Sequence, residues 1–238
     1  MASNHFLDTL EGEDRSVLEP KLSKIALTAG ECLVGRGDNV DHVYLPITSI
    51  VSVITTMKDG TSIESRTIGR ESGYGLLHAL GSRYSYEHVE VQVGGDAYRL
   101  STAALDAAAA NSVSLRKAIV EHAQVTLVQS AQTVACNALH GVRQRMCRWL
   151  LMTRDRLDSD IVPLTQEHLS IMLGVQRTTV TGVAASLQVE GLIRYSRGRI
   201  RLVEPEKVRH CACECYEQVE SSVSAILPDP GGRRPVRT

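Results

Sequence analysis

The spacing of apolar residues divides the 238-residue chain into regions of different structure. Between Thr28 and about Leu100, short runs of alternating apolar and polar residues are separated by glycines, which is typical of short antiparallel strands. These runs cover residues 32–34, 43–45, 50–55, 62–68, 88–93 and 97–100. The sequence Lys58-Asp59-Gly60 marks a hairpin turn. We therefore expect a small antiparallel β-roll, barrel or sandwich, preceded in residues 5–28 by short helical pieces that serve only for packing.

A long helix is predicted from about residue 115 to residue 139, and at 1.5 Å per residue it would be about 37 Å long. Its apolar residues form two stripes, so the helix needs more than one packing partner. One stripe comprises Val120, Ala123, Leu127, Ala131, Val134 and Ala138, and beside it lie Leu115, Ala118, Val125, Val128, Ala135 and Leu139. We expect the helix to pack on its own roll and, through the first stripe, on the same helix of a second subunit. A monomer with this helix buried on both sides is the alternative.

His140 and Gly141 interrupt the helical pattern and form a predicted hinge. A further helix then ends near Leu157. Residues 164–204 follow with the pattern helix, tight turn, helix and β-hairpin. Thr165 suits the N-cap of the first of these helices, and Gly174 suits the left-handed position that ends it. The hairpin turns at Ser196-Arg197-Gly198, so this segment has the organisation of a winged helix-turn-helix.

The side chains that this segment exposes on its surface are of the kinds that bind DNA. An exposed arginine near the start of a helix in the major groove can pair with guanine O6 and N7, while threonine can contact a thymine methyl or a phosphate. The candidate DNA-binding residues are Thr165, Gln176, Arg177, Thr178, Thr179, Thr181, Arg197 and Arg199. A helical hairpin used only for packing is the alternative, and the attached wing argues against it.

Charge is distributed unevenly, although the formal net charge is only −1. Residues 1–140 hold 11 basic and 16 acidic residues, whereas residues 141–207 hold 11 and 7. The basic excess therefore lies on the helix-turn-helix segment, where a polyanion would bind. No stretch approaches the roughly 20 apolar residues of a membrane span, and the N-terminus lacks a secretion signal, so we expect a cytoplasmic protein with no membrane partner.

Other candidate chemistry is sparse. No Ser/His/Asp spacing, phosphate-cradling glycine loop or His-x-x-Glu metal motif is present, so an enzyme is not expected. Of the six cysteines, Cys136 and Cys147 fall on apolar helix faces and are expected in the core. Cys211, Cys213 and Cys215 form a possible redox or metal site. On a continuous helix Cys213 would point away from the other two, and thiols that merely pack are the favoured interpretation.

Two histidines and two tyrosines lie where the roll could hold a ligand. They are His78, Tyr84, Tyr86 and His88. Side chains of these types in a roll are more often rim residues hydrogen-bonded to water or backbone than ligands of a haem or a small molecule. We therefore predict no cofactor, and the effector, if there is one, is unknown.

The order of β-roll, long helix, hinge and winged helix resembles the Crp/Fnr family of bacterial transcription regulators. The resemblance covers about residues 6–216 and is nearest to a branch that carries the strings DHVYLP, TIGRE, ACN, LTQEHL, GLIRY and CECY. It implies a cyclic-nucleotide-binding-like N-terminal domain and a homodimer joined along the long helix. It also implies binding to a near-palindromic operator in double-stranded DNA and contact with RNA polymerase.

This sequence departs from the family pattern in three places. Residues 72–93 lack both the glutamate after the glycine and the arginine followed by serine or threonine that hold cyclic AMP, since Arg83 precedes Tyr84. We therefore expect no cyclic-AMP binding by that mode. Cys32 stands alone, which removes the family's iron-sulfur mode of oxygen sensing. In the second helix, Thr178 and Gly182 replace the family's glutamate and second arginine, so a different half-site is expected.

The sequence thus predicts an α+β protein in four parts. Residues 1–113 form a sensor-like β-roll, residues 114–140 the dimerisation helix, residues 141–208 the winged helix-turn-helix domain, and residues 209–238 a cysteine segment with a mobile tail from Pro228. The predicted function is that of a homodimeric, sequence-specific regulator of transcription. A ligand-, redox- or metal-sensing protein that kept the fold without specific DNA binding is the alternative.

Overall fold

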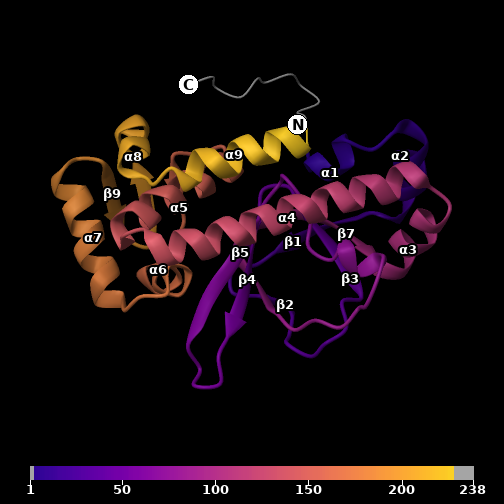
Figure 1. The fold of residues 1–238 in the computed structure, drawn as a ribbon, viewed down its shortest axis with the longest axis horizontal. Helices are drawn as coiled ribbons and strands as arrows, with labels where there is room; N and C mark the ends of the chain where they lie inside the picture. The colour runs from indigo at the N-terminus through magenta and orange to yellow at the C-terminus, as the bar shows by residue number, and fades with distance from the viewer. Residues whose placement is uncertain (1–2, 228–238) are drawn as a thin grey trace.

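The computed structural model describes residues 3–227, which form a β-roll, a long helix and a smaller helical domain with its own sheet (Figure 1). The roll begins with helices α1 (His5–Asp8) and α2 (Gly12–Leu18) and the 3-10 helix η1 (Glu19–Lys21). Its remaining elements are β1 (Ser23–Leu27), β2 (Cys32–Val34), β3 (His42–Pro46), β4 (Ile50–Thr56), β5 (Ser62–Ile68), the 3-10 helix η2 (Leu77–Ala79), β6 (His88–Val93) and β7 (Gly95–Ser101). The predicted α+β fold class is confirmed.

The strands of the roll pair antiparallel in two sheets, with the orders β1-β7-β3 and β2-β6-β4-β5. The predicted apolar runs correspond to β2 through β7, because alternation turns one side of each strand toward the interior. The predicted hairpin turn joins β4 to β5, and Gly60 in it has a φ of +87°, a conformation that favours glycine.

Residues 5–28 were expected to contain short helical pieces used for packing, but Ser23–Leu27 is a strand. That segment is strand β1, which pairs with β7 so that Ile25 lies opposite Ala97. Only Leu27 of the strand is fully buried, whereas Lys24 and Ala26 are exposed. The strand is only five residues long and its apolar residues are consecutive, so the sequence alone gives a weak strand signal, and pairing with β7 decides the conformation.

Helix α3 (Thr102–Ala110) leads into the long helix α4 (Val113–Leu139). The 27 residues of α4 make it about 40 Å long. The hydroxyl of Ser112 caps the helix by accepting a hydrogen bond from the Leu115 backbone N–H. The inner side of α4 covers the roll, and its buried residues there include Leu115, Ile119, His122 and Val125.

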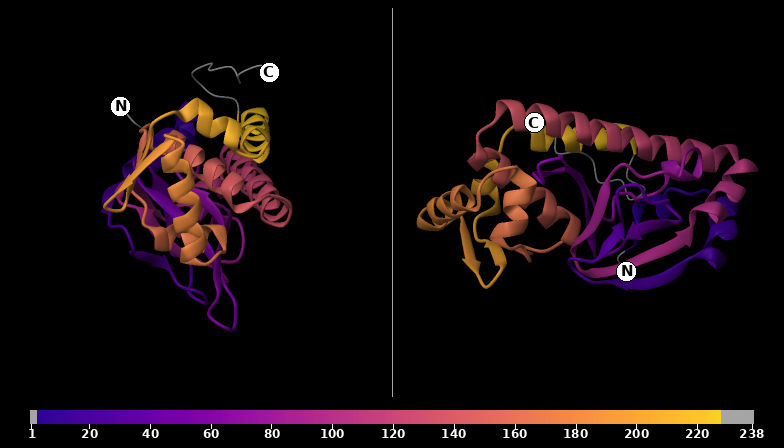
Figure 2. Two further views of the ribbon diagram at one scale, coloured as in Figure 1. Left: turned by 90° about the vertical axis from the view of Figure 1, so that its left-hand side faces the viewer. Right: turned by 90° about the horizontal axis from the view of Figure 1, so that it is seen from below.

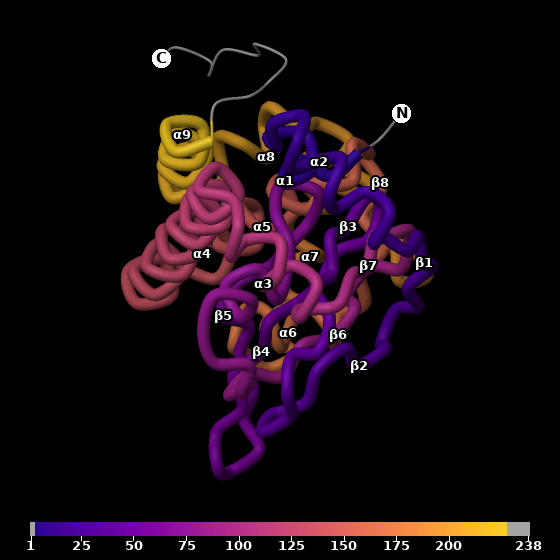
Figure 3. Tube along the Cα trace, turned by 90° about the vertical axis from the view of Figure 1, so that its right-hand side faces the viewer, coloured from indigo at the N-terminus to yellow at the C-terminus, as the bar shows by residue number. Residues whose placement is uncertain are grey.

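The C-terminal domain follows α4 after a sharp break. It consists of α5 (Val142–Leu157), β8 (Ile161–Val162), α6 (Gln166–Leu173), α7 (Arg177–Val189), β9 (Ile193–Ser196), β10 (Arg199–Leu202) and α8 (Pro205–Cys211). Its three strands form a sheet in the order β8-β10-β9. The last helix, α9 (Cys215–Ile226), turns back and runs along α4, and Figure 3 shows the two side by side at one edge of the molecule.

Within residues 3–227, no helix is both long enough and apolar enough to span a membrane. Residues 228–238, predicted to be a mobile tail, lie outside the described part of the chain.

The roll and the C-terminal domain are joined by buried polar contacts. The carboxylate of Glu64 on β5 accepts a hydrogen bond of 2.9 Å from the Trp149 indole N–H on α5. Arg156 on α5 forms an ion pair of 2.8 Å with Glu71. Burial opposes the ionisation of Glu71, but the Arg156 guanidinium and the hydrogen bonds from backbone N–H groups together outweigh it and lower the pKa of that carboxyl. Burial raises the pKa of Glu64 to about 7, even though the hydrogen bonds from Ser52 and Trp149 act in the opposite direction.

The raised pKa of Glu64 gives a testable dependence of stability on pH. Because its pKa is about 7 in the folded protein and 4.5 as the ordinary value, neutral Glu64 contributes stability that is fully present below pH 4.5. This contribution is lost as the pH rises through 7. Glu64→Gln removes the titration. We expect the difference in unfolding free energy between wild type and variant to change by about 3 kcal/mol across this window, measured by denaturant unfolding. Parallel stability curves for the two proteins would contradict the assignment.

Candidate nucleic-acid interface

The turn between α6 and α7 is fixed by the two residues that the sequence singles out. The Thr165 hydroxyl caps α6 by accepting a hydrogen bond of 3.2 Å from the His168 N–H. Gly174 ends α6 in the left-handed conformation, with φ of 60° and ψ of 40°. A Cβ there would also lie 2.8 Å from Ile63 Cδ1 on the neighbouring strand β5. The helix-turn-helix therefore has the predicted geometry, and the left-handed backbone favours glycine at position 174.

Helix α7 exposes the predicted residues at its N-terminal end. Val180, Ala184 and Leu187 are buried in the domain core. The exposed polar residues are Gln176, Arg177, Thr178, Thr179 and Thr181. Thr181 is not free, because its hydroxyl donates to the Arg177 carbonyl and lies 3.1 Å from Gln166 Oε1. In the left view of Figure 2, α7 and the β9–β10 hairpin lie at the end of the molecule that faces the viewer.

The predicted wing is the hairpin of β9 and β10. Both turn residues have positive φ, 50° for Arg197 and 71° for Gly198, as a tight two-residue hairpin requires. A Cβ on Gly198 would lie 3.6 Å from Thr165 Cγ2, so the tip of the wing is next to the start of α6. Arg197 and Arg199 are exposed, and Thr165 is exposed beside them.

The structure adds two arginines that the sequence interpretation did not select. Arg194 on β9 and Arg201 on β10 lie directly opposite each other and are both exposed. The alternation of arginine with buried Ile193, Ile200 and Leu202 was the signal that could have identified them. Two like charges at one cross-strand position repel each other unless an anion lies nearby. The arginine pair is therefore suited to binding the phosphate backbone of a nucleic acid.

Unpaired cations of the C-terminal domain are concentrated at this end. Elsewhere in the domain, Arg143, Arg154 and Arg156 have carboxylate partners. Arg145 and Arg148 instead donate hydrogen bonds to uncharged groups, among them Asn137 and Thr133. In the part of the chain that the structure describes, five exposed arginines lack any carboxylate within 4.0 Å at this end of the domain: Arg177, Arg194, Arg197, Arg199 and Arg201. We call α7 and the wing, with these five arginines, the reader face.

The outer side of α4 carries the predicted apolar stripe. Val120 is 46% exposed, and Leu127 and Val134 are each 70% exposed. Ala131 and Ala138 are also exposed, and Ala123 is half-buried. No other described segment covers these residues, so within residues 3–227 the helix is buried on one side only. Most of the neighbouring apolar residues instead face inward, although Leu139 is 77% exposed.

The predicted hinge is the break between α4 and α5. His140 has φ of −112° and ψ of 146°, which ends α4, and Gly141 caps α5 with φ of −67°. Any residue can adopt these angles, so the bend does not depend on glycine. Rotation at this break stays a prediction. His140 itself is held by Glu214, whose carboxylate lies 3.2 Å from its Nε2.

The structure corrects the grouping of the cysteines. Helix α8 ends at Cys211 and α9 begins at Cys215, with extended backbone at Ala212, so no continuous helix carries the three residues. Cys211 lies apart, 3.5 Å from Arg143. Cys213 and Cys215 instead meet Cys136 and His140. Cys136 is thus buried as expected, but among thiols. Cys147 does lie in the apolar core, where burial raises its pKa to about 12.

A cleft of about 830 Å³ lies between the roll and α4. His78, Tyr84 and Tyr86 line it, whereas His88 lies elsewhere, beside Cys32 and Glu90. Arg66 is the only lysine or arginine among its lining residues, and it is paired with Glu87 at 2.6 Å and 2.9 Å. Burial lowers the pKa of His122 in the cleft to about 4 and also lowers that of His78. Among the described residues, the cleft therefore offers no free cation for a phosphate.

Comparison with known proteins agrees with this geometry. Residues 144–211 match the family described as the Crp-like helix-turn-helix domain. No curated protein sequence matches the chain significantly. Among solved structures, FixK2 from Bradyrhizobium japonicum is similar with a TM-score of 0.70 and 16% identity, over 81% of this chain and 98% of that one.

Two other structures show the same fold at low identity. A putative regulator of the Crp/Fnr family from Eubacterium rectale has a TM-score of 0.66 and 15% identity, over 86% of this chain and 95% of that one. The c-di-GMP-responsive regulator CLP of Xanthomonas campestris has a TM-score of 0.66 and 16% identity, over 82% of this chain and all of that one, 100%.

Fold, reader face and comparisons together define a protein with a C-terminal winged helix-turn-helix domain of the Crp-like type. Residues 144–211 match the Crp-like helix-turn-helix family, and the chain as a whole has the fold of solved structures that include a regulator of the Crp/Fnr family.

Proposed function

We propose that the protein acts as a homodimer that binds near-palindromic operators in double-stranded DNA and reads their sequence with α7. The observation that carries this proposal is the reader face, where exposed Arg177 stands at the start of α7 beside four further arginines that have no carboxylate partner among residues 3–227. A helix of this kind fits the major groove, and the wing arginines suit the phosphate backbone. Thr165, Gln176, Thr178, Thr179 and Thr181 complete the proposed contact set.

Dimer formation is proposed from the exposed stripe on α4. Its large apolar residues recur every seven positions, at Val120, Leu127 and Val134, with exposed alanines between them. This is the spacing of a two-stranded coiled-coil seam. Two copies of α4 joined there place two reader faces on one duplex, so each chain contacts one half-site. The division at residues 113, 140 and 208 into roll, dimerisation helix and reader domain is part of this proposal.

Cyclic AMP is not the proposed effector in the usual binding mode. The cleft has the position for a ligand, but its single guanidinium, that of Arg66, is already neutralised by Glu87. An enclosed phosphate without a cationic partner is strongly disfavoured. Contact with RNA polymerase is proposed from the family resemblance alone.

Salt dependence of duplex binding tests the proposed role of the wing. Contact with several phosphates makes the logarithm of the affinity fall steeply with the logarithm of salt concentration. Replacing Arg197 and Arg199 together by alanine should weaken binding to all duplexes and reduce this slope by about two, because roughly one unit of slope belongs to each phosphate that an arginine neutralises. Fluorescence anisotropy at several salt concentrations measures both quantities.

A control that removes the same charge is Arg36→Ala combined with Lys58→Ala on the exposed surface of the roll. This pair should leave the slope unchanged. Equal slopes for the wing variant and the wild type would contradict phosphate contact by the wing.

A further inference from the structure

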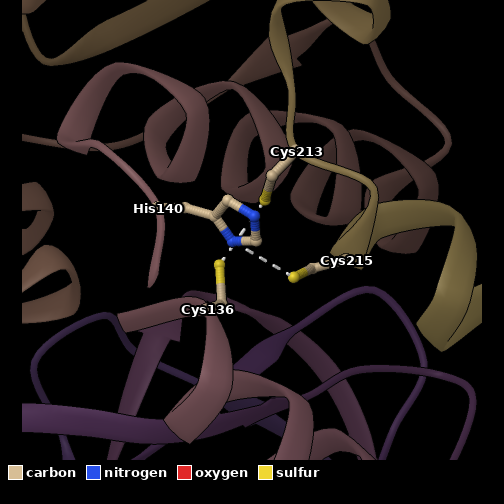
Figure 4. A group of neighbouring side chains, drawn as sticks. All are labelled: Cys136, His140, Cys213 and Cys215. Carbon is tan, nitrogen blue, oxygen red and sulfur yellow. Dashed lines mark hydrogen bonds between the residues drawn. The ribbon is translucent and has the colours of Figure 1, made fainter. Parts of the chain in front are cut away.

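Four potential metal ligands converge where the long helix ends. Cys136 lies in the last turn of α4, His140 caps that helix, and Cys213 and Cys215 lie at the start of α9 (Figure 4). The three sulfurs and one imidazole nitrogen all lie within 4.8 Å of one another. Cys136 Sγ is 3.5 Å from Cys213 Sγ, and Cys215 Sγ is 3.5 Å from His140 Nδ1.

The two 3.5 Å contacts are close to the separations of ligand atoms in a tetrahedral site for a single ion. With Zn–S bonds of about 2.3 Å and a Zn–N bond of about 2.0 Å, tetrahedral geometry separates two sulfurs by about 3.8 Å and a sulfur from a nitrogen by about 3.5 Å. The two measured contacts differ from these values by at most a few tenths of an ångström. Three thiols and an imidazole are soft ligands of the set that selects zinc among the common divalent ions.

The thiols are not part of an apolar core. Cys136, Cys213 and Cys215 are 0%, 3% and 1% exposed and form a buried cluster of their own. A buried cysteine that only packs lies among aliphatic and aromatic side chains, as Cys147 does in the core of the C-terminal domain.

Neighbouring side chains orient two of the ligands. His140 Nε2 lies 3.2 Å from the Glu214 carboxylate, so donation of its N–H to that carboxylate leaves the lone pair of Nδ1 directed at the thiols. Histidines that bind metals commonly have such a carboxylate partner. The Gln132 amide donates a hydrogen bond of 3.0 Å to Cys215 Sγ, which stabilises a thiolate.

In the sequence, the four residues flank the C-terminal domain that carries the reader face. Cys136 and His140 directly precede α5, and Cys213 and Cys215 directly follow α8. An ion held by all four would cross-link the entry and exit of the domain to the end of α4. It would therefore fix the predicted hinge at His140 and Gly141.

We propose that Cys136, His140, Cys213 and Cys215 bind one zinc-type divalent ion, and that the bound ion fixes the orientation of the reader domain on α4. Binding releases the thiol protons and joins the metal to three thiolates and the neutral imidazole. The second half of the proposal rests on the proposed function, because it concerns the presentation of the two recognition helices to DNA.

Metal content tests the site without reference to DNA. The full chain, purified under reducing conditions, is stripped with a chelator and titrated with Zn²⁺, and with Co²⁺ as a spectroscopic probe. We expect one ion per chain by elemental analysis, visible absorption typical of tetrahedral cobalt thiolate, and a melting temperature that falls on chelation and recovers on adding Zn²⁺.

Matched variants locate the site. Cys136→Ser and Cys213→Ser should abolish the cobalt spectrum, whereas Cys211→Ser, outside the group, should leave it unchanged. Wild-type protein that takes up no ion, or an equal loss in Cys211→Ser, would overturn the proposal. So would a disulfide between Cys136 and Cys213 in freshly purified, metal-free protein, detected by mass spectrometry. The wild-type titration needs no variant to fold.

Duplex binding by the metal-free and metal-bound wild type then tests the coupling. We expect metal removal to weaken operator binding by about tenfold, within the usual range for coupled sites, and Zn²⁺ to restore it. Stoichiometric metal binding with unchanged affinity for the operator would refute the coupling but would not contradict the metal site or the proposed function. Stoichiometric metal binding by a protein that prefers no duplex would refute the proposed function but would not contradict the metal site.

Discussion

Leu127→Glu is expected to convert the dimer into a monomer and to lower affinity for a two-half-site operator by about a hundredfold or more. Leu127 lies in the middle of the stripe on α4 and is 70% exposed in the single chain. In a seam around a twofold axis, two new carboxylates would be buried close together without partners, which is strongly unfavourable. A monomer contacts only one half-site, so it loses the additional affinity that two linked binding sites provide.

Sedimentation measures the oligomeric state and anisotropy the affinity. Met57→Glu is the control, because Met57 is an apolar residue, 61% exposed, in the turn that joins β4 to β5. Figure 1 shows this hairpin pointing away from α4. This variant should remain dimeric. A dimer that survives Leu127→Glu would contradict the proposed seam.

Arg177→Ala should lower the affinity for the preferred operator by about 1–3 kcal/mol and relax the preference at one guanine position. Arg177 is the first residue of α7 and is exposed, and within the described residues it has no carboxylate partner. Its removal therefore leaves no buried charge, and the weaker affinity reports on binding rather than on folding. The measurement is competition between operators that differ at single base pairs.

Arg36→Ala on the roll removes the same charge away from the reader face and should leave both affinity and preference unchanged. An equal loss on every sequence would show that Arg177 contacts phosphate rather than a base. The neighbouring Thr178 lacks the carboxylate that would accept from cytosine N4, so we expect a half-site different from the one common in the family.

Features governed by local chemistry could be predicted from the sequence. The cap at Thr165, the left-handed Gly174 and the turn at Gly198 could each be predicted from one or two residues, and all three are present in the structure. Strand β1 and the two-residue strand β8 were not predicted. Each is too short to show a period, and each forms because a partner strand, β7 or β10, is available.

The candidate sites divide in the same way. Arg177 and the wing arginines could be found because helix and strand periodicity separates inside from outside. The cysteine cluster could not, because Cys136 and Cys213 are 77 positions apart and only the packing of α9 on α4 brings them together. The assumption of a continuous helix through residues 211–215 placed Cys211 in the wrong group.

Selection of duplexes from a random pool by the purified full chain tests the central claim most directly. The claim is that two copies of α7, held apart by paired α4 helices, read two half-sites. The predicted result is an enriched inverted repeat, bound by two chains, with half-site centres about 34 Å apart, one turn of the duplex. No enrichment over random sequence, or a single unrepeated site bound by one chain, would contradict it.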